Sequence, residues 1–452
     1  MIKNKNRSLI TEGSISKALL YFFFPILFGS FFQQLYNTAD AIIVGRYLGK
    51  GALAAVGGST AVIINLLINF FIGLSSGASV IIAQRYGSGN TERTDKAVHT
   101  SLALALVFGI AISVFGFVFS RQMLSLIDTP AEILEISNRY LKIYFAGSMT
   151  LILYNMGCGI FRALGDSRHP LYFLITGSIA NILLDFLFIG YFDMGVTGAA
   201  MATVLSQAVS MALTLIYLLR LDYGFKISFI KTRFDMRELR DIIRIGVPVG
   251  LQSALYNITN LLIQSGVNAL GTDAVAAWAA YSKIDAFFWM VDNAFGISIT
   301  TFVGQNYGAG NRERIKKGMW VCTLLALVVT LSIQVVYITF GRSILFLFTS
   351  DENVIEIGKT IINIVVPFFV VFLPIEILSG VIKGCGKVMT STILTLSGIC
   401  LLRFLWMFTG ARIWPGIESI MLAYPITWSV TALLFIVYYF RGHWLKEGVS
   451  GK

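Results

Sequence analysis

The stretch "LGKGALAAVGGSTAVIINLLINFFIGLSSGASVIIAQRYGSGNTER" (residues 48–93) returns in altered form as "LGTDAVAAWAAYSKIDAFFWMVDNAFGISITTFVGQNYGAGNRER" (270–314). With one deleted position, Gly49 aligns with Gly271, Gln84 aligns with Gln305, and the motif Tyr-Gly-x-Gly-Asn recurs near the end of both stretches. "GIFRALG" (159–165) likewise matches "GVIKGCG" (380–386). A repeat of this length predicts two homologous halves.

The composition is that of a membrane protein. Of 452 residues, 56% are hydrophobic and 13% charged, and the mean hydropathy is +0.76, which is far too apolar for a soluble chain of this length. The first apolar run carries Asp40 and lacks a signal-peptide cleavage pattern, so we interpret it as a span. Apolar runs of about 20 residues or more predict spans near 15–44, 52–82, 97–120, 133–160, 169–192, 196–219, 241–267, 275–303, 318–341, 354–381, 388–411 and 417–440.

We therefore predict an all-α polytopic membrane protein with twelve transmembrane helices in two six-helix lobes. Six is an even number, so both halves enter the membrane from the same side, as parallel repeats about a pseudo-two-fold axis normal to the membrane. The predicted parts are an N-terminal lobe (1–219), a basic cytoplasmic linker (220–245) that is partly an amphipathic helix, and a C-terminal lobe (246–452).

The basic residues predict the orientation. Cytoplasmic loops of membrane proteins carry an excess of Lys and Arg, and placing both termini inside leaves outside only Arg46, Lys50, Arg121, Arg342 and Arg412. The net charge of +11 then reflects this asymmetry and attraction to an anionic leaflet, so no nucleic-acid partner is expected. Four Cys without a C-x-x-C pair and only three His favour neither a disulfide framework nor a metal centre.

The first span ends in "QQLYNTADAIIVG" (33–45), which places the ionisable Asp40 in lipid. Such a group costs roughly 2.5–3.5 kcal/mol on insertion scales and marks a candidate functional site. Counted from the outer ends of their spans, Tyr140, Asp185 and Thr203 lie at a similar depth, and Asn181 precedes Asp185 by one helical turn. Asn37 and Gln33 share the face of Asp40. We predict that Asp40, Tyr140, Asn181, Asp185 and Thr203 form a cation-coupling site.

Two carboxyl groups close together in a low dielectric cannot both ionise cheaply, so one is expected to hold a proton. The same oxygens, with Asn and Thr, could instead hold Na⁺ at Asp40, Asn181, Asp185 and Thr203. A third reading is that these side chains only join helices by hydrogen bonds. The residues alone leave the three readings open.

Other polar residues are candidates for the wall of a substrate cleft between the lobes. In the repeat alignment Arg403 lies opposite Asn181, and Asn155 lies opposite Glu376. We expect Arg403 to pair with a carboxylate, Glu376 being the candidate, in a structural role. Lys283, Asp285 and Asp292 form another charged set, expected to be internally paired. The candidate cleft residues are Gln33, Gln34, Tyr36, Asn37, Asn155, Tyr256, Asn257, Glu376 and Arg403.

Several motifs together resemble the multidrug and toxic compound extrusion (MATE) family over essentially the whole chain. They are Tyr36-x-x-x-Asp40 followed by "VGRYLG", the loops "AQRYGSGN" and "GQNYGAGN", "RALGDSRHP", and "NILLDFLFIGYFDMGVTGAAMATVLSQ" (181–207). Resemblance to the prokaryotic DinF-type branch implies a cation site of Asp40, Asn181, Asp185, Thr203 and Tyr140. The other bacterial branch has an acidic residue in the seventh span, where this chain has Tyr256 and Asn257. That departure favours coupling to H⁺, with Na⁺ left open.

The resemblance implies a monomeric secondary antiporter in a bacterial or archaeal plasma membrane, exporting cationic or amphipathic drugs or toxins in exchange for H⁺ or Na⁺ by alternating access, without a cofactor. Membrane lipids are the other expected partners. The alternative is a flippase for a lipid-linked saccharide from the related superfamily, for which a cationic cleft or additional helices would be expected. An intramembrane enzyme would need a D-D-x-x-D, an H-E-x-x-H or a Ser/His pair, and no such cluster occurs, so we expect a protein that is not an enzyme.

Overall fold

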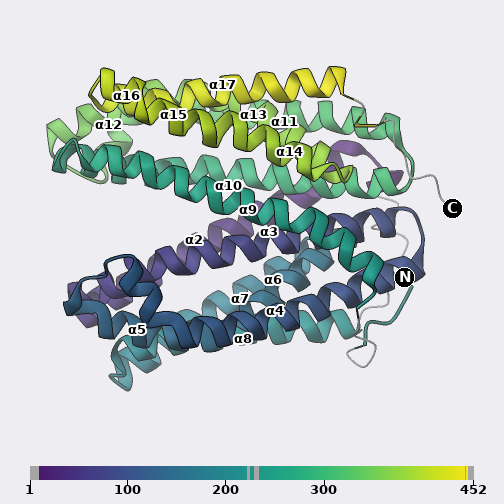
Figure 1. The fold of residues 1–452 in the computed structure, drawn as a ribbon, viewed down its shortest axis with the longest axis horizontal. Helices are drawn as coiled ribbons and strands as arrows, with labels where there is room; N and C mark the ends of the chain where they lie inside the picture. The colour runs from purple at the N-terminus through teal and green to yellow at the C-terminus, as the bar shows by residue number, and fades with distance from the viewer. Residues whose placement is uncertain (1–9, 221–223, 229–233, 443, 446–452) are drawn as a thin grey trace. The chain divides into compact units, whose positions relative to one another are not determined.

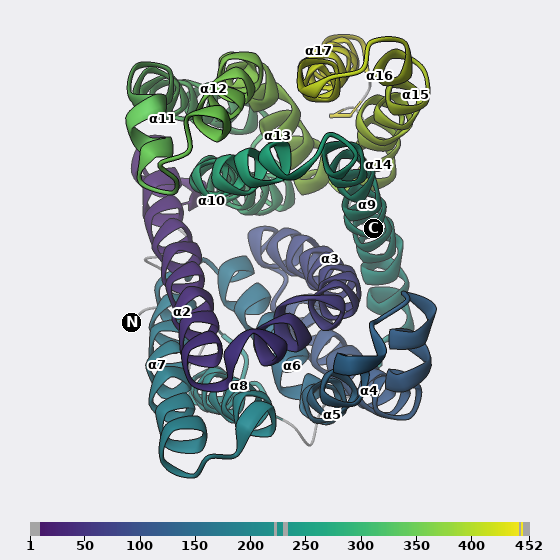
Figure 2. The ribbon, with the colours of Figure 1, turned by 90° about the vertical axis from the view of Figure 1, so that its left-hand side faces the viewer.

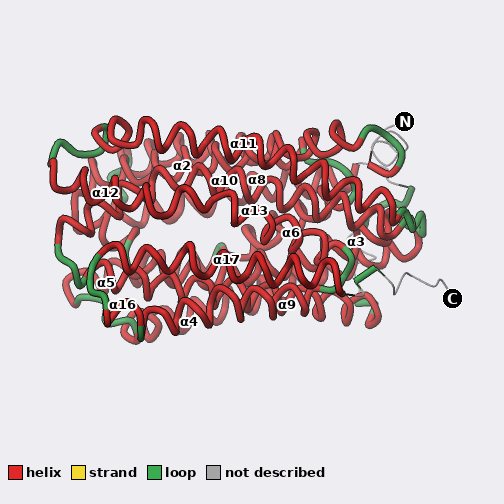
Figure 3. The backbone as a smooth tube through the Cα atoms, turned by 90° about the horizontal axis from the view of Figure 1, so that it is seen from above, coloured by secondary structure: helices red, strands yellow, loops and turns green. Residues whose placement is uncertain are grey.

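The structure is a computed structural model that describes residues 10–220, 224–228, 234–442 and 444–445. All regular secondary structure in this described part is helical (Figure 3). The N-terminal half contains α2 (Ile15–Gly57), α3 (Ser59–Gly87), α4 (Thr91–Leu126), α5 (Ala131–Ala146), α6 (Ser148–Ala163), α7 (Arg168–Asp185), the π-helix η1 (Phe186–Tyr191) and α8 (Gly195–Arg220).

The C-terminal half is also built from helices (Figure 1). It contains α9 (Met236–Asn268), α10 (Thr272–Gly308), α11 (Arg312–Phe346), α12 (Glu352–Val365), the short 3₁₀ helix η3 (Val366–Phe368), α13 (Phe369–Gly384), α14 (Val388–Thr395), the π-helix η4 (Leu396–Leu401), α15 (Leu402–Phe408), α16 (Gly410–Ile413) and α17 (Ile417–Arg441).

Membrane-length helices dominate the described residues. Ten of them are long and apolar enough to cross a bilayer, or eleven if α5 and α6, which meet at a 48° bend, form one broken span. The prediction of an all-helical membrane protein is thus confirmed. By length and hydropathy, however, the described residues contain ten or eleven candidate spans and not the predicted twelve. The missing one is the predicted span 241–267, which lies in α9. That helix forms but is not among the sufficiently apolar ones, because the amide side chains of Gln252, Asn257 and Asn260 lower the hydropathy of its central turns.

The chain divides into two compact units, and two of the boundaries between them fall inside helices, one in α2 and one in α9. Unit 1 includes Phe24–Gly250, and unit 2 includes Ile10–Phe23 together with the chain from Leu251 onward. In unit 1, α7 packs against α8, and α3, α4 and α6 pack together; in unit 2, α10 packs against α13 and α11. In Figure 2 many of these helices, such as α11 and α17, are seen foreshortened, whereas α2 runs across the view. Helix α2 therefore contributes its first turns to unit 2 and the rest to unit 1.

The repeat is visible in the backbone at two pairs of glycines. Gly49 (φ 80°, ψ −176°) interrupts α2, and its counterpart Gly271 (φ 101°, ψ −178°) precedes α10. Gly89 (φ 77°) and Gly310 (φ 75°) are a second matching pair. Side chains disfavour these positive φ values, which explains why glycine stands at both aligned positions.

Only part of the predicted basic linker is described. Residues 221–223 and 229–233 lie outside the described part, as do the terminal cations at 1–9 and 446–452 that entered the predicted orientation. Residues 236–245 of that linker are the beginning of α9. Asp235 Oδ1 accepts the backbone N–H groups of Glu238 (3.2 Å) and Arg237 (3.0 Å). These bonds, with that of Glu238 first, hold the pKa of Asp235 below its usual range, as expected for a carboxylate at a helix start.

The segment before α2 is tied to unit 2 by Arg314 of α11. Its Nε donates to the carbonyl of Ile10 (2.9 Å) and its Nη2 donates to the carbonyl of Gly13. Asn306 Nδ2 also donates to the Ile10 carbonyl (3.2 Å), and the rings of Phe23 and Phe295 stack with their centroids 4.1 Å apart. One guanidinium thus bridges two carbonyls of the segment that leads into α2.

Replacing Arg314 with Gln should lower the melting temperature by several degrees and speed proteolysis of the segment before α2. Two charge-assisted hydrogen bonds are lost, each contributing about 1.5–3 kcal/mol. Arg312→Gln is the matched control, because Arg312 is exposed in the same turn and loses the same charge. Thermal melts and limited proteolysis in detergent check this; equal melting temperatures for the two variants would contradict the anchoring role.

Candidate functional site

The predicted coupling residues gather in unit 1 around a pair of carboxyl groups. Asp40 lies on α2 and Asp185 at the end of α7, and the two side chains lie close together. Asp185 is 0% exposed and Asn181, one turn earlier on α7, is 1% exposed. Neither Asp185 oxygen, nor Asp40 Oδ1, nor either amide atom of Asn181 has a hydrogen-bond partner among the described residues. This leaves five buried polar atoms unsatisfied, and unsatisfied buried polar groups are costly.

Tyrosines complete the surroundings of this pair. Tyr140 of α5 is buried, lies near Asp40, and has its hydroxyl next to the Thr203 side chain of α8. Tyr36, one turn before Asp40 on α2, lies near both Asp40 and Asp185. The structure thus brings Asp40, Asp185, Tyr140 and Thr203 together, with Asn181 adjacent.

An apolar layer packs around the site. Ile43, Val44, Ala199 and Ala200 are buried in one cluster with Tyr140, so the polar groups have little competing solvent. The π-helix η1 starts directly after Asp185, and π-turns often occur at functional sites. The arrangement is a pair of carboxyl groups in a low-dielectric surrounding, which favours binding of a proton or a small cation over two bare negative charges.

Not every predicted neighbour approaches the carboxyl pair. Gln33, Gln34 and Asn37 are exposed on α2, and within the described residues none of them hydrogen-bonds Asp40. Tyr36 approaches instead. Sequence reasoning missed Tyr144 and Gln207, whose side chains meet near the site; each stands four positions after a predicted site residue, so helical spacing could have identified them.

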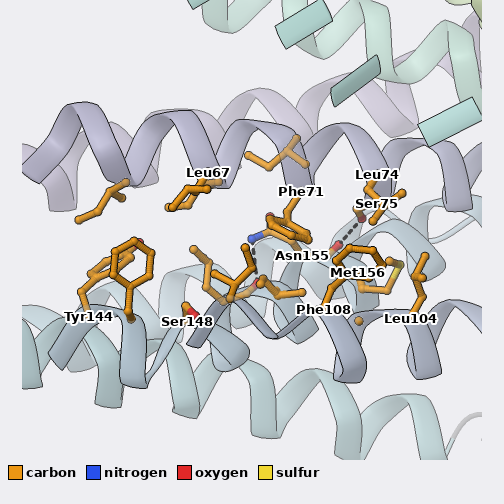
Figure 4. Close-up of a pocket in the computed structure, with 18 residues that line it drawn as sticks. Leu67, Phe71, Leu74, Ser75, Leu104, Phe108, Tyr144, Ser148, Asn155 and Met156 are labelled. Carbon is orange, nitrogen blue, oxygen red and sulfur yellow. Dashed lines mark hydrogen bonds between the residues drawn. The ribbon is translucent and has the colours of Figure 1, made fainter. Parts of the chain in front are cut away.

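Asn155 lies elsewhere in unit 1, in the wall of an apolar pocket between α3, α4, α5 and α6 (Figure 4). Its side-chain Nδ2 donates to the Leu151 carbonyl (2.9 Å), and its backbone carbonyl accepts the Ser75 hydroxyl (3.0 Å). Apart from Asn155 and two serines, the lining is almost entirely aliphatic and aromatic, with Phe71, Phe108 and Met156 among its members. The pocket suits an apolar group more than a charge.

In unit 2 the predicted pairing of Arg403 with Glu376 is wrong. Arg403 donates from Nη1 to Asn260 Oδ1 (2.9 Å), with the rings of Tyr424 and Tyr256 at 4.5 and 5.6 Å from its guanidinium carbon. Glu376 lies beside the buried Asp292, and its Oε1 fills the space where a side chain at Gly296 would begin. The two helices present these side chains to different neighbours.

The other polar candidates of unit 2 have local partners. Asn257 donates to the Ser253 carbonyl (3.0 Å). Asp285 accepts the Tyr281 hydroxyl (3.2 Å) and Trp289 Nε1 (2.6 Å), while Lys283 is exposed, so the expected internal pairing of that charged set is also wrong. Aromatic donors replace the lysine as partners of Asp285.

The loop of "RALGDSRHP" forms a capping turn. Asp166 Oδ1 accepts the backbone N–H groups of Arg168 (3.0 Å) and His169 (3.2 Å) at the start of α7, and its other oxygen contacts His169 Nδ1. This satisfies donors that a helix start leaves free.

Comparison with known proteins gives consistent matches. The MatE family model matches twice, at residues 25–187 and 248–409. The probable multidrug resistance protein YoeA of Bacillus subtilis is 28% identical, with 97% of this chain and 96% of that protein covered. A crystal structure of MATE in the bent conformation has a TM-score of 0.90 at 26% identity, covering 98% of both chains. An outward-facing multidrug resistance MATE family transporter of the MOP superfamily has a TM-score of 0.89 at 25% identity, covering 98% and 99%.

The two matched stretches fall one in each half, as the internal repeat requires. Together they include more than half of the residues. This chain therefore belongs to the MatE family, and it is a multi-pass membrane transporter and not an enzyme.

Proposed function

We propose that this transporter is a secondary active multidrug antiporter of the DinF-type branch, which exports cationic or amphipathic organic compounds in exchange for H⁺ or Na⁺. The observation that carries the proposal is the pair formed by Asp40 and Asp185 in unit 1, with Asn181 beside it and five buried atoms unsatisfied. An ion that enters this pair satisfies the carboxyl oxygens among them.

The physical reason is charge balance. Two adjacent carboxylates in an apolar surrounding repel one another strongly, and a proton or a monovalent cation between them removes most of that repulsion. A carboxyl that releases its proton must find a new partner, so ion binding biases the position of α2 relative to α7 inside unit 1. A site that binds an ion in one arrangement and releases it in the other is what coupling requires.

H⁺ is the coupling ion that the chain favours. On α9, at the position where the other bacterial branch has an acidic residue, this chain has Tyr256 and Asn257, which supports the DinF-type assignment and coupling in unit 1. Na⁺ would use the oxygens of Asp40, Asn181, Asp185 and Thr203, a ligand set compatible with a hard cation. Transport under separate H⁺ and Na⁺ gradients distinguishes the two ions.

The full architecture completes the proposal. Twelve spans are reached when α9, 33 residues long, crosses the membrane despite its polar positions, as buried helices of transporters do. The chain consists of the lobes 1–219 and 246–452, joined by the linker 220–245. Both termini lie in the cytoplasm, and the protein resides in a bacterial or archaeal plasma membrane. The functional unit is a monomer that contacts membrane lipids and alternates access between its lobes.

The substrate class is inferred from two features of unit 1. The apolar pocket with Phe71, Phe108 and Met156 in its lining (Figure 4) suits flat lipophilic groups, since aromatic and Met side chains adapt to varied shapes. The carboxyl pair supplies negative charge for a cationic group. Relatives named as multidrug resistance and multidrug export proteins agree with a drug-like substrate.

The decisive experiment is efflux of ethidium or norfloxacin from proteoliposomes with purified protein, under an imposed pH gradient and then an imposed Na⁺ gradient. We expect transport driven by the pH gradient. Transport driven by Na⁺ alone would assign the other ion, and folded protein that transports under neither gradient would favour the flippase for a lipid-linked saccharide.

A further inference from the structure

The guanidinium of Arg403, on α15 in unit 2, is 0% exposed yet only partly used. Nη1 donates to Asn260 Oδ1 at 2.9 Å. Nε and Nη2 are buried and have no hydrogen-bond partner among the described residues. A buried charge with unmade hydrogen bonds is strongly destabilising. We therefore expect Nε and Nη2 to bind an acceptor from outside the chain.

The aromatic neighbours of Arg403 stabilise its charge without neutralising it. The ring of Tyr424 lies 4.5 Å and that of Tyr256 5.6 Å from the guanidinium carbon, within the range of cation–π attraction. The hydroxyl of Tyr256 lies close to the guanidinium and is itself buried without a hydrogen-bond partner in the described part of the chain. Three polar donors of these two side chains are therefore available in one place.

No acidic side chain of the described residues forms an ion pair with Arg403. The nearby Asp285 accepts from Tyr281 and Trp289, and Glu376 lies beside Asp292 instead. Ordered water could occupy the available donors, but water brings no negative charge. Within its described residues, unit 2 thus holds a buried cation that forms no ion pair.

We propose that Arg403 binds a carboxylate group of the transported substrate. Nε–H and Nη2–H lie on the same edge of the planar guanidinium and point in parallel, which matches the two oxygens of a carboxylate in a bidentate pair. Nη1, on the other edge, is held by Asn260, and Tyr256 offers a third donor. The geometry selects amphipathic substrates with a carboxylate, including zwitterions that also carry an amine.

This inference rests on the proposed function, and its test measures binding without any ion gradient. Norfloxacin and its ethyl ester differ in the carboxylate alone, and isothermal titration calorimetry in detergent gives the ratio of their affinities. Wild type should bind the acid at least about tenfold more tightly than the ester, since bidentate charge-assisted pairs are strong. In Arg403→Gln the ratio should fall close to one.

A second variant keeps the arginine and its packing. Asn260→Asp places a carboxylate beside the guanidinium, where it competes with the ligand, so the affinity ratio should again fall close to one. The matched control is Asn268→Asp, two turns further along α9, where the residue is exposed and accepts from Gln264. It adds the same charge to the same helix and should keep the wild-type ratio.

The outcomes are separable. A wild-type protein that binds acid and ester equally overturns the carboxylate site but leaves the multidrug function standing. Unchanged ratios in both Arg403→Gln and Asn260→Asp also overturn it. A wild type that binds neither compound contradicts the proposed function and the carboxylate site together.

Discussion

Asp40→Asn is expected to abolish gradient-driven efflux while the protein stays folded. Asn has the same shape and can still hydrogen-bond, but it cannot take up or release a proton, and it removes one of the two charges that hold a cation. The initial rate of efflux should fall by more than about a hundredfold. A positioned side chain that takes up or releases a proton contributes at least about that factor, and in the variant the coupled step no longer occurs. Proteoliposome efflux under a pH gradient measures it, with size-exclusion chromatography to show that the variant is folded.

The matched control for this prediction is Asp193→Asn. Asp193 is exposed in the same unit and has a φ of 49°, a conformation that Asn adopts at least as readily as Asp. Its efflux should stay at the wild-type rate. A folded Asp40→Asn variant with full activity would remove Asp40 from the coupling mechanism, whichever ion is used.

Gly77→Val is expected to prevent unit 1 from assembling. Gly73 and Gly77 on α3 face Gly246 and Gly250 on α9, a pair of Gly-x-x-x-Gly motifs. A Cβ at Gly77 would lie 2.5 Å from the Gly246 backbone, and one at Gly73 would lie 2.4 Å from Gly250 N. The helices touch backbone to backbone, as is typical of small-residue contacts in membranes, so neither can yield by changing a rotamer.

The cost of this overpacking should reach about 3 kcal/mol or more, because backbone must move. The measurement is the monodisperse fraction in fluorescence-detected size-exclusion chromatography, together with the melting temperature. Gly51→Val is the control, since a Cβ at Gly51 meets nothing within 4 Å. If Gly77→Val behaved like Gly51→Val, the close α3–α9 contact would be refuted.

The error in placing Arg403 has a local physical cause. The repeat alignment places Arg403 opposite Asn181, but a π-helix, η4, lies just before Arg403, whereas the π-helix of the first half, η1, comes after Asp185. A π-turn inserts a residue and rotates the subsequent helical residues by about 100° around the helix axis. Arg403 therefore faces Asn260 and Tyr424. Glu376 lies before this π-turn, on α13, and faces Asp292 because of how α13 packs against α10.

The first-half site was more accessible to sequence reasoning. Asp185 and Asn181 stand four apart on one uninterrupted helix, α7, so helical spacing places them on the same face. The approach of α2 to α7, which joins Asp40 to Asp185, depends on how separate helices pack. The same dependence explains why Tyr36 and not Asn37 faces the carboxyl pair, since one residue changes the direction of a side chain by about 100°.

The sequence by itself determined the helical membrane class, the internal repeat and the polar residues within the spans, because apolar run length, recurrence and local spacing are properties of the chain read in order. The tertiary structure alone decided which side chains meet. It assigned Ile10–Phe23 to unit 2, left Arg403 without a carboxylate partner among the described residues, and brought α3 against α9. Those contacts depend on helix rotation, π-turns and close packing, which local patterns do not encode.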